Sequence, residues 1–146
     1  MNTIVVDASI VAKWYIAEDD SEKAIQIRDA YSSGKITISS PTLLIYEIGS
    51  TLTKHPSFTS EDSAAAFKSL LDLGLNLRDF TDPQLLGKIF RISRELQVTF
   101  YDATYVALAK EYDAKLITAD EGLHNKIKEY CNSQLLSEVK PEELIG

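Results

Sequence analysis

The chain has 146 residues, of which 45% are hydrophobic and 25% are charged, which is the composition of an ordinary globular protein. This length favours one domain over residues 1–146 with a sizeable core. The formal net charge of -7 disfavours a protein that simply coats nucleic acid, because phosphate contacts need local positive charge.

The N-terminal stretch and the cysteine content bear on the compartment. MNTIVVDAS has no basic segment and carries an acid beside its apolar residues, unlike a signal peptide. No apolar run approaches the roughly 20 residues that span a bilayer, so we expect no membrane partner. The single cysteine, Cys131, cannot form an internal disulfide, which suits a reducing compartment. We therefore expect a cytoplasmic protein.

Short apolar segments alternate with segments of helical periodicity along the whole chain. Ser40 before Pro41, and Asp82 before Pro83, are typical of a helix start with proline in the first turn. In chain order we predict a strand at 3–6, helices at 9–15 and 21–33, a strand at 35–40, helices from 41 to about 54 and from 60 to 74, a strand at 75–80, helices at 82–97 and 102–112, a strand at 114–118, a helix at 121–130 and a strand at 134–139.

The repeated order of strand and helix predicts the fold class. Strands separated by helices imply a parallel sheet with helices on both faces. The short apolar strands, such as IVV and LIT, fit burial on both faces. We predict an α/β protein with three α/β/α layers and a central parallel sheet of about five strands.

Three aspartates occupy equivalent places in this architecture. Asp7 follows the first strand, Asp120 follows the strand LIT, and Asp102 begins a predicted helix. The carboxyl ends of parallel strands and the starts of the following helices share one edge, where open α/β sheets bind ligands. We therefore predict that these three carboxylates converge on one rim.

Glu47 is expected to reach the same rim from a helix. In SPTLLIYEIGSTL, the residues Leu44, Glu47 and Ile48 follow the i, i+3, i+4 spacing of a core-facing stripe. With a rise of 1.5 Å per residue, Glu47 lies about 10 Å along the helix from Ser40. A helix that tilts across the rim would bring its carboxylate to the three aspartates.

Each acid also has a purely structural interpretation. The three aspartates could be helix N-caps worth about 1 kcal/mol each, and Glu47 could lie at the margin of its stripe. Together, however, two carboxylates ~5 Å apart repel by about 3 kcal/mol at an effective dielectric of ~20. Four on one rim require protonation or a cation, and sites rich in carboxylate oxygens suit Mg²⁺ or Mn²⁺.

Three stretches carry a resemblance to a known family: IVVDAS, SPTLLIYEIGSTL and TFYDATYVALAKEYDAKLITAD. The chain resembles the PIN-domain ribonucleases, in particular the toxin-like, VapC-type members of toxin–antitoxin pairs, over nearly its whole length and in order. The resemblance implies a five-stranded parallel sheet between helices. It also implies a metal-dependent endoribonuclease that cleaves single-stranded or loop RNA with one or two Mg²⁺ or Mn²⁺ ions. The metal ligands and catalytic residues that it implies are Asp7, Glu47, Asp102 and Asp120.

Further expectations follow from the resemblance. Ser9 and Thr118 match hydroxyl-bearing positions of the family and are expected to donate hydrogen bonds that orient the metal ligands. Independently of the resemblance, RNA phosphates would need cations near the rim, and Lys13, one short helix after Asp7, is a candidate. Family members commonly form homodimers, for which helices within residues 42–74 are a plausible surface, and the toxin-like members are held inactive by a cognate antitoxin. Where some relatives carry a further acid or asparagine near the site, Glu121 here is interpreted as a first-turn helix acid.

Other functions remain as alternatives. A PIN-like module could bind RNA or a protein without cutting, and the sequence alone leaves that open. A phosphoacceptor receiver domain needs two adjacent acids after its first strand, whereas Asp7 is followed by Ala8 and Ser9. A haloacid-dehalogenase-type phosphatase needs Asp-x-Asp at the same place, and the second acid is absent.

Overall fold

The computed structural model describes residues 1–145, which contain a five-stranded parallel sheet in the order β3-β2-β1-β4-β5. All four strand pairs are parallel. The strands are β1 (Asn2–Val6), β2 (Ile36–Pro41), β3 (Asn76–Arg78), β4 (Lys115–Thr118) and β5 (Ser133–Leu135). The predicted parallel sheet of about five strands is confirmed.

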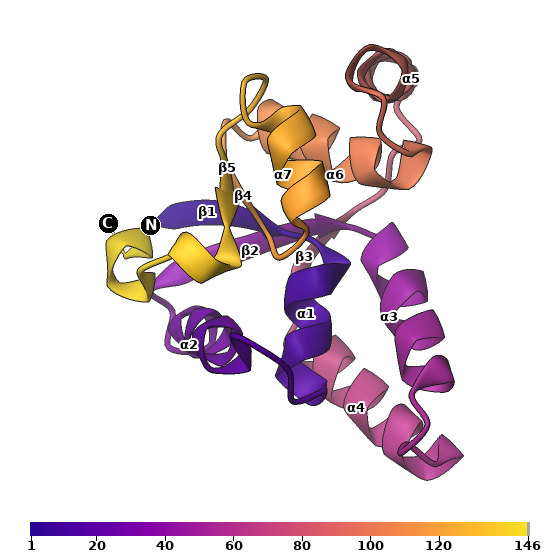
Figure 1. The fold of residues 1–146 in the computed structure, drawn as a ribbon, viewed down its shortest axis with the longest axis vertical. Helices are drawn as coiled ribbons and strands as arrows, with labels where there is room; N and C mark the ends of the chain where they lie inside the picture. Colours follow the sequence, from indigo (N-terminus) through magenta and orange to yellow (C-terminus); the bar gives the residue numbers. More distant parts are fainter. Residues whose placement is uncertain (146) are drawn as a thin grey trace.

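Helices cover both faces of this sheet (Figure 1). The first group lies on one face and consists of α1 (Ala8–Tyr15), α2 (Ser21–Ser32), α3 (Leu43–Lys54) and α4 (Ser60–Asp72). The second group lies on the opposite face and consists of α5 (Pro83–Leu96), α6 (Phe100–Glu111) and α7 (Glu121–Ile127). Two 3-10 turns, Leu136–Glu138 and Pro141–Leu144, follow β5. The α/β/α layering is therefore as predicted.

The central strand β1 shows why the sheet has two cores. Ile4 and Val6 pack with the first group of helices, whereas Val5 between them packs with the second. Successive side chains of a strand point to opposite faces, so a continuous apolar run serves both layers. The exposed fractions of Ile4, Val5 and Val6 are 2%, 0% and 0%, and each such side chain contributes about 1.5–3 kcal/mol by burial.

The strand order places a topological switch beside β1. The chain builds β2 and β3 outward on one side of β1, and then adds β4 and β5 on the other side. Right-handed crossovers in opposite directions put the connecting helices on opposite faces. The carboxyl ends of β1 and β4 therefore adjoin where the connections diverge, which is where open α/β sheets form a ligand crevice.

Several predicted boundaries differ from the structure; α7, for example, ends at Ile127 and not at residue 130. Ser40 and Pro41 end β2 instead of starting a helix, because the Ser40 hydroxyl donates to the Val6 carbonyl at 2.7 Å and β2 continues beside β3. The helix predicted from Asp102 begins two residues earlier, at Phe100. The last predicted strand is shorter, since the chain turns into a 3-10 helix at Leu136.

Local capping signals were reliable where the side chain acts on its own helix. Asp82 caps α5 and accepts from the Gln84 amide at 3.0 Å, with Pro83 in the first turn as predicted. Thr59 caps α4 by accepting from the Asp62 amide, and the Asp62 carboxylate accepts from the Thr59 amide at 3.0 Å, which completes a capping box. No helix within residues 1–145 combines the length and apolar character needed to cross a bilayer.

Candidate functional site

Asp7 lies at the switch between β1 and β4 and is 5% exposed. It caps α1, and its Oδ1 accepts hydrogen bonds from the Ser9 amide, at 3.1 Å, and from the Ser9 hydroxyl. Its Oδ2 accepts from the hydroxyl of Thr118 at the end of β4. Burial raises the pKa of Asp7 to about 6, although both hydroxyls act in the opposite direction. The carboxylate is thus fixed and poorly solvated, and a nearby positive charge would stabilise its ionised form.

Ser9 and Thr118 connect Asp7 to the loop that follows β4. The Ser9 hydroxyl, while donating to Asp7, accepts from the Ala119 amide at 2.9 Å. The Thr118 hydroxyl likewise donates to Asp7 and accepts from the Asp120 amide at 3.1 Å. Each hydroxyl therefore orients Asp7 and the chain leading to Asp120 at the same time.

Asp120 caps α7, and its Oδ1 accepts from the Leu123 amide at 3.0 Å. Its side chain is exposed. Gly122 lies directly against it, because a Cβ at that position would stand 3.3 Å from Asp120 Oδ1. Such a contact is tighter than a normal van der Waals contact, so the absence of a side chain at Gly122 leaves room for this carboxylate.

Asp102 is not a helix cap, so the capping interpretation holds for Asp7 and Asp120 but is wrong for Asp102. Thr99 caps α6, and its hydroxyl accepts from the Asp102 amide at 3.0 Å, which places Asp102 at the third helical position. The half-buried carboxylate of Asp102 has a raised pKa, first because of burial and then because of the charge of Asp120. N-capping therefore does not explain why Asp102 lies at this edge.

Glu47 approaches from α3 and is held by α6. The Tyr105 hydroxyl donates to Glu47 Oε1 at 2.6 Å. Burial raises the pKa of Glu47, the hydrogen bond from Tyr105 lowers it, and the charge of Asp102 raises it further. The helical stripe thus carries Glu47 toward the other acids, although its helix begins at Leu43 and not near Ser40.

The four acids lie along one edge, with Asp102 as their common neighbour. Its charge raises the pKa of Asp7 and of Glu47, and the charge of Asp120 raises its own pKa. In the arrangement of residues 1–145, however, no three Asp, Glu, His or Cys side chains close around one point that an ion could occupy. Like charges repel, and Asp7 and Glu47 are each tied to hydroxyl groups, so the carboxylates are spread along the edge.

The donor set suits a hard divalent cation. The four candidate ligands are carboxylates, and hydroxyl groups lie behind two of them. Oxygen ligands of this kind are those that Mg²⁺ and Mn²⁺ prefer, whereas zinc sites usually include Cys or His. Burial is the largest cause of the raised pKa of Asp7, Glu47 and Asp102, and the charge of a neighbouring acid adds to it in each case. A shared ion would need side-chain rotation or bridging water.

Two hollows flank the acids, and Asp120 lines both. One, of about 320 Å³, includes Ser9 and Lys13; the other, of about 240 Å³, includes Asp102 and Lys126. Lys13 was among the sequence candidates, whereas Lys126 was missed. The available signal was its helical spacing, since Lys126 follows Gly122 by four residues and therefore lies on the same side of α7.

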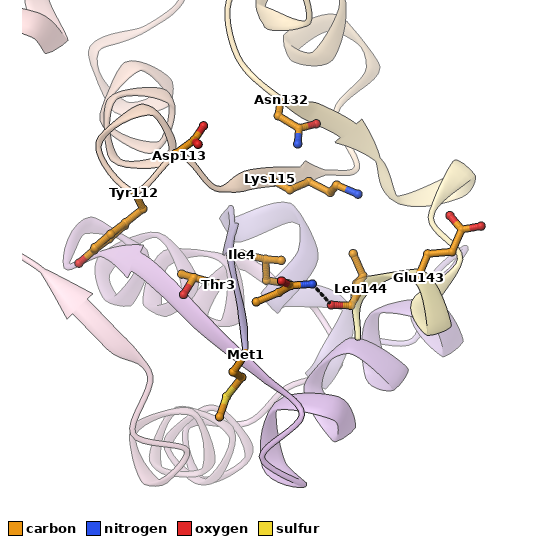
Figure 2. Close-up of a pocket in the computed structure, with 10 residues that line it drawn as sticks. Met1, Thr3, Ile4, Tyr112, Asp113, Lys115, Asn132, Glu143 and Leu144 are labelled. Carbon is orange, nitrogen blue, oxygen red and sulfur yellow. Dashed lines mark hydrogen bonds between the residues drawn. The ribbon is translucent and has the colours of Figure 1, made fainter. Parts of the chain in front are cut away.

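A larger hollow, of about 370 Å³, lies at the opposite edge of the sheet (Figure 2). It is bordered by the amino ends of β1 and β4 and by Leu144, whose carbonyl accepts from the Asn2 side chain at 2.9 Å. Figure 2 shows Lys115 and Asn132 on one side of it and Thr3 and Ile4 on the other. Its position away from the carboxyl ends of the strands separates it from the acidic edge.

Comparison with known proteins agrees with this geometry. A family model described as PIN domain matches residues 4–129. Ribonuclease VapC3 of Pyrobaculum aerophilum is 33% identical to the chain over 126 residues, which cover 84% of this chain and 93% of that protein.

Solved structures give the same result for the fold. The crystal structure of PAE2754 from Pyrobaculum aerophilum has a TM-score of 0.64 at 26% identity, with 97% of each chain covered. VapBC2 from Rickettsia felis, solved with a DNA fragment from its promoter, has a TM-score of 0.66 at 15% identity, with 91% of this chain and 96% of that chain covered. At such low identity the second similarity concerns the fold alone.

Proposed function

Because this chain belongs to the PIN-domain family, we propose that it is a divalent-metal-dependent endoribonuclease that cleaves single-stranded or loop RNA. It would act as the toxin of a toxin–antitoxin pair. The relative named ribonuclease VapC3 supports the activity, and the cluster of carboxylates at the sheet edge supports the metal requirement. The proposed metal ligands and catalytic residues are Asp7, Glu47, Asp102 and Asp120.

The geometry suggests which role each acid has in binding the metal. Asp7 is the rigid ligand, because Ser9 and Thr118 hold its two oxygens. Asp102 is the second, because it neighbours each of the other acids. Glu47 and Asp120 would complete the oxygen cage from either side, partly through water. One or two Mg²⁺ or Mn²⁺ ions bound there would screen the phosphodiester charge and generate a water-derived nucleophile at neutral pH.

The single observation that carries the proposal is the placement of Asp102. Its amide is already capped by Thr99, its carboxylate is half-buried, and the charge of Asp120 further raises its pKa. Carboxylates that repel each other do not stabilise the fold when they lie close together, whereas a cation site needs them close together. Acids whose pKa is shifted by burial and by a neighbouring charge are typical of functional sites.

Calorimetric titration with Mn²⁺ tests the metal site. The wild type is expected to bind Mn²⁺, and Asp102→Asn to lose most of the binding heat while keeping the same circular dichroism spectrum. Asp82→Asn is the matched control, because Asp82 caps α5 and lines neither of the two hollows beside the acids. Equal Mn²⁺ binding by the wild type and Asp102→Asn would remove the proposed site.

Cleavage of a pool of structured and single-stranded RNAs tests the activity. We expect endonucleolytic products in Mn²⁺, none in EDTA, and none with Asp7→Asn or Asp102→Asn. If the wild type with Mn²⁺ leaves the pool intact while it still binds the metal, the nuclease proposal fails for those substrates.

A second candidate is a PIN-like module that binds RNA or a protein without cutting. The observation in its favour is that, within residues 1–145, the carboxylates do not close around one point. The two experiments above separate the candidates, since a module of this kind would bind RNA with no Mn²⁺-dependent product.

The proposed partners follow from the same family assignment. Structural neighbours include toxin–antitoxin complexes, which supports a cognate antitoxin for this chain. A homodimer is supported by exposed apolar side chains on α3 to α6, namely Tyr46, Leu71, Phe90 and Tyr101. Sedimentation equilibrium would report the oligomeric state. The proposed compartment is the cytoplasm, where an RNA substrate would be met.

A further inference from the structure

The two hollows beside the acids have the same construction. In each, an aspartate caps a helix, and a lysine six residues later lies in the last turn of that helix: Asp7 and Lys13 on α1, Asp120 and Lys126 on α7. Six residues correspond to about 9 Å along a helix. Each lysine lines its own hollow, and Asp120 lines both.

Lys126 is placed across its hollow from the site. Its Nζ donates to the Gln97 carbonyl at 2.9 Å, which brings the ammonium group from α7 to the C-terminal end of α5. The same hollow is lined by Thr99 and Asp102. The charge of Lys126 acts against the burial of Asp102 by lowering the pKa of that acid, so the ammonium group contributes to the electrostatics of the acidic edge.

Lys13 lies on the other side of Asp120. Its hollow is bordered by Ser9 and Ala119, which belong to the hydrogen-bonded network around Asp7, and by Thr51 of α3. Several other lysines are occupied elsewhere: Lys68 pairs with Asp72, Lys88 with Glu111, and Lys140 with Glu143. Among the described residues, neither Lys13 nor Lys126 forms a salt bridge, and they line the two hollows that share Asp120.

A substrate with several negative charges needs such positions. A chain with a net charge of -7 and four acids at one edge repels the phosphates of a nucleic acid. Cations at the site would offset the charge where the bond is cut, but the neighbouring phosphates still require positive partners. Lysine is a compact point charge that serves a single phosphate well.

We propose that Lys13 and Lys126 each bind a backbone phosphate on opposite sides of the scissile one, so that a single-stranded RNA runs from one hollow across Asp120 into the other. This inference rests on the proposed nuclease function and assigns the path of its substrate. It also gives a role to Lys126, which shares a hollow with Asp102.

The test is steady-state cleavage of a fluorophore-labelled pool of random single-stranded RNA in Mn²⁺, from about 50 to about 300 mM KCl. Lys13→Met and Lys126→Met are each expected to raise KM about 3- to 10-fold with little change in kcat. Each is also expected to reduce the slope of log(kcat/KM) against log[KCl] by ~0.7, since one phosphate contact is lost. Lys126→Arg, which keeps the charge, should restore the slope.

Lys128→Met is the matched control, because Lys128 ends the same helix and lines neither hollow. It should behave as the wild type. Mn²⁺ affinity by calorimetry should not fall in any lysine-to-methionine variant, because each substitution removes a positive charge that repels the metal ion. A salt slope for Lys13→Met and Lys126→Met equal to that of Lys128→Met would overturn the inference, as would a loss of Mn²⁺ affinity that accounts for the change in KM.

The outcomes for the two proposals are distinct. If the wild type cuts RNA with Mn²⁺ and the KM and salt slope of its lysine variants equal those of the wild type, the phosphate path is rejected and the nuclease function stands. A wild type that neither binds Mn²⁺ nor cuts RNA removes the nuclease function, and this path with it.

Discussion

The hydroxyl of Tyr105 donates to Oε1 of Glu47 at 2.6 Å and joins α6 to α3 across 58 positions of the chain. Tyr105 is 1% exposed, so its ring belongs to the core and its hydroxyl reaches the acidic edge. Burial, and then the charge of Glu47, raise the pKa of the phenol, which keeps it protonated as a donor. Tyr105 therefore positions Glu47 from inside the protein.

Tyr105→Phe removes that donor with little change in volume. We expect Mn²⁺ affinity to fall about 10-fold, because residues that orient metal ligands typically contribute 10- to 100-fold to metal binding. The free energy of unfolding should fall by only about 1 kcal/mol, since the half-buried Glu47 can bond to water instead. Calorimetry and urea denaturation measure the two effects. Tyr101→Phe on the same helix is the control, because Tyr101 is 59% exposed.

Asp7 is expected to lower the stability of the protein in EDTA at neutral pH. Its pKa is about 6 in the folded state against an ordinary value of 3.8, so the folded protein holds more protons than the unfolded chain between these values. The free energy of unfolding therefore falls as pH rises through this window and stays lower above it. The contribution is about 3 kcal/mol at most, taking 1.36 kcal/mol per pKa unit.

Asp7→Asn should accordingly raise the free energy of unfolding in EDTA at pH 7 by about 1–3 kcal/mol, while it removes Mn²⁺ binding. The gain should shrink toward pH 4, where Asp7 is largely protonated in the wild type. Urea denaturation of both proteins across this range gives the difference curve. A variant less stable than the wild type at pH 7 would mean that the hydrogen bonds of the carboxylate outweigh its burial.

Gly122→Ala should separate stability from metal binding. The added Cβ would lie 3.3 Å from Asp120 Oδ1 and push the carboxylate aside, whereas alanine is otherwise favoured in a helix. We expect Mn²⁺ affinity to fall several-fold with stability equal or higher. Gly87→Ala in α5 is the control, since its Cβ would have nothing within 4 Å. Unchanged metal affinity in Gly122→Ala would show that Asp120 is not a ligand.

The thiol of Cys131 should react slowly. Burial raises its pKa to about 11 from an ordinary 9.0, although Lys110 acts against this. At pH 8 the thiolate fraction is then about 100-fold lower than for an unperturbed thiol, and the thiolate is the reactive species. Alkylation by iodoacetamide, followed by mass spectrometry, should therefore be slow in the native protein and become fast in urea. Equal rates in both conditions would contradict the burial of this side chain.

Much of the architecture was predictable because its signals are local. The apolar runs and the Asp82–Pro83 start each act within a few residues, and each predicted strand and helix is present, with ends that shift by a few residues. The interpretation of Ser40–Pro41 as a helix start was wrong. The same pair that can start a helix here ends a strand, because the Ser40 hydroxyl finds the Val6 carbonyl in the neighbouring strand.

The sequence by itself determined the order of strands and helices, and with it the edge to which Asp7 and Asp120 belong, since the carboxyl ends of parallel strands adjoin. Only the tertiary structure decided that Asp102 is the neighbour of every other acid, that Tyr105 holds Glu47, and that Lys126 lies across a hollow from Asp102. The reason is physical. A capping or periodicity signal acts within one or two turns, whereas these contacts depend on how α3, α6 and α7 pack on the sheet, and packing depends on side chains throughout the chain.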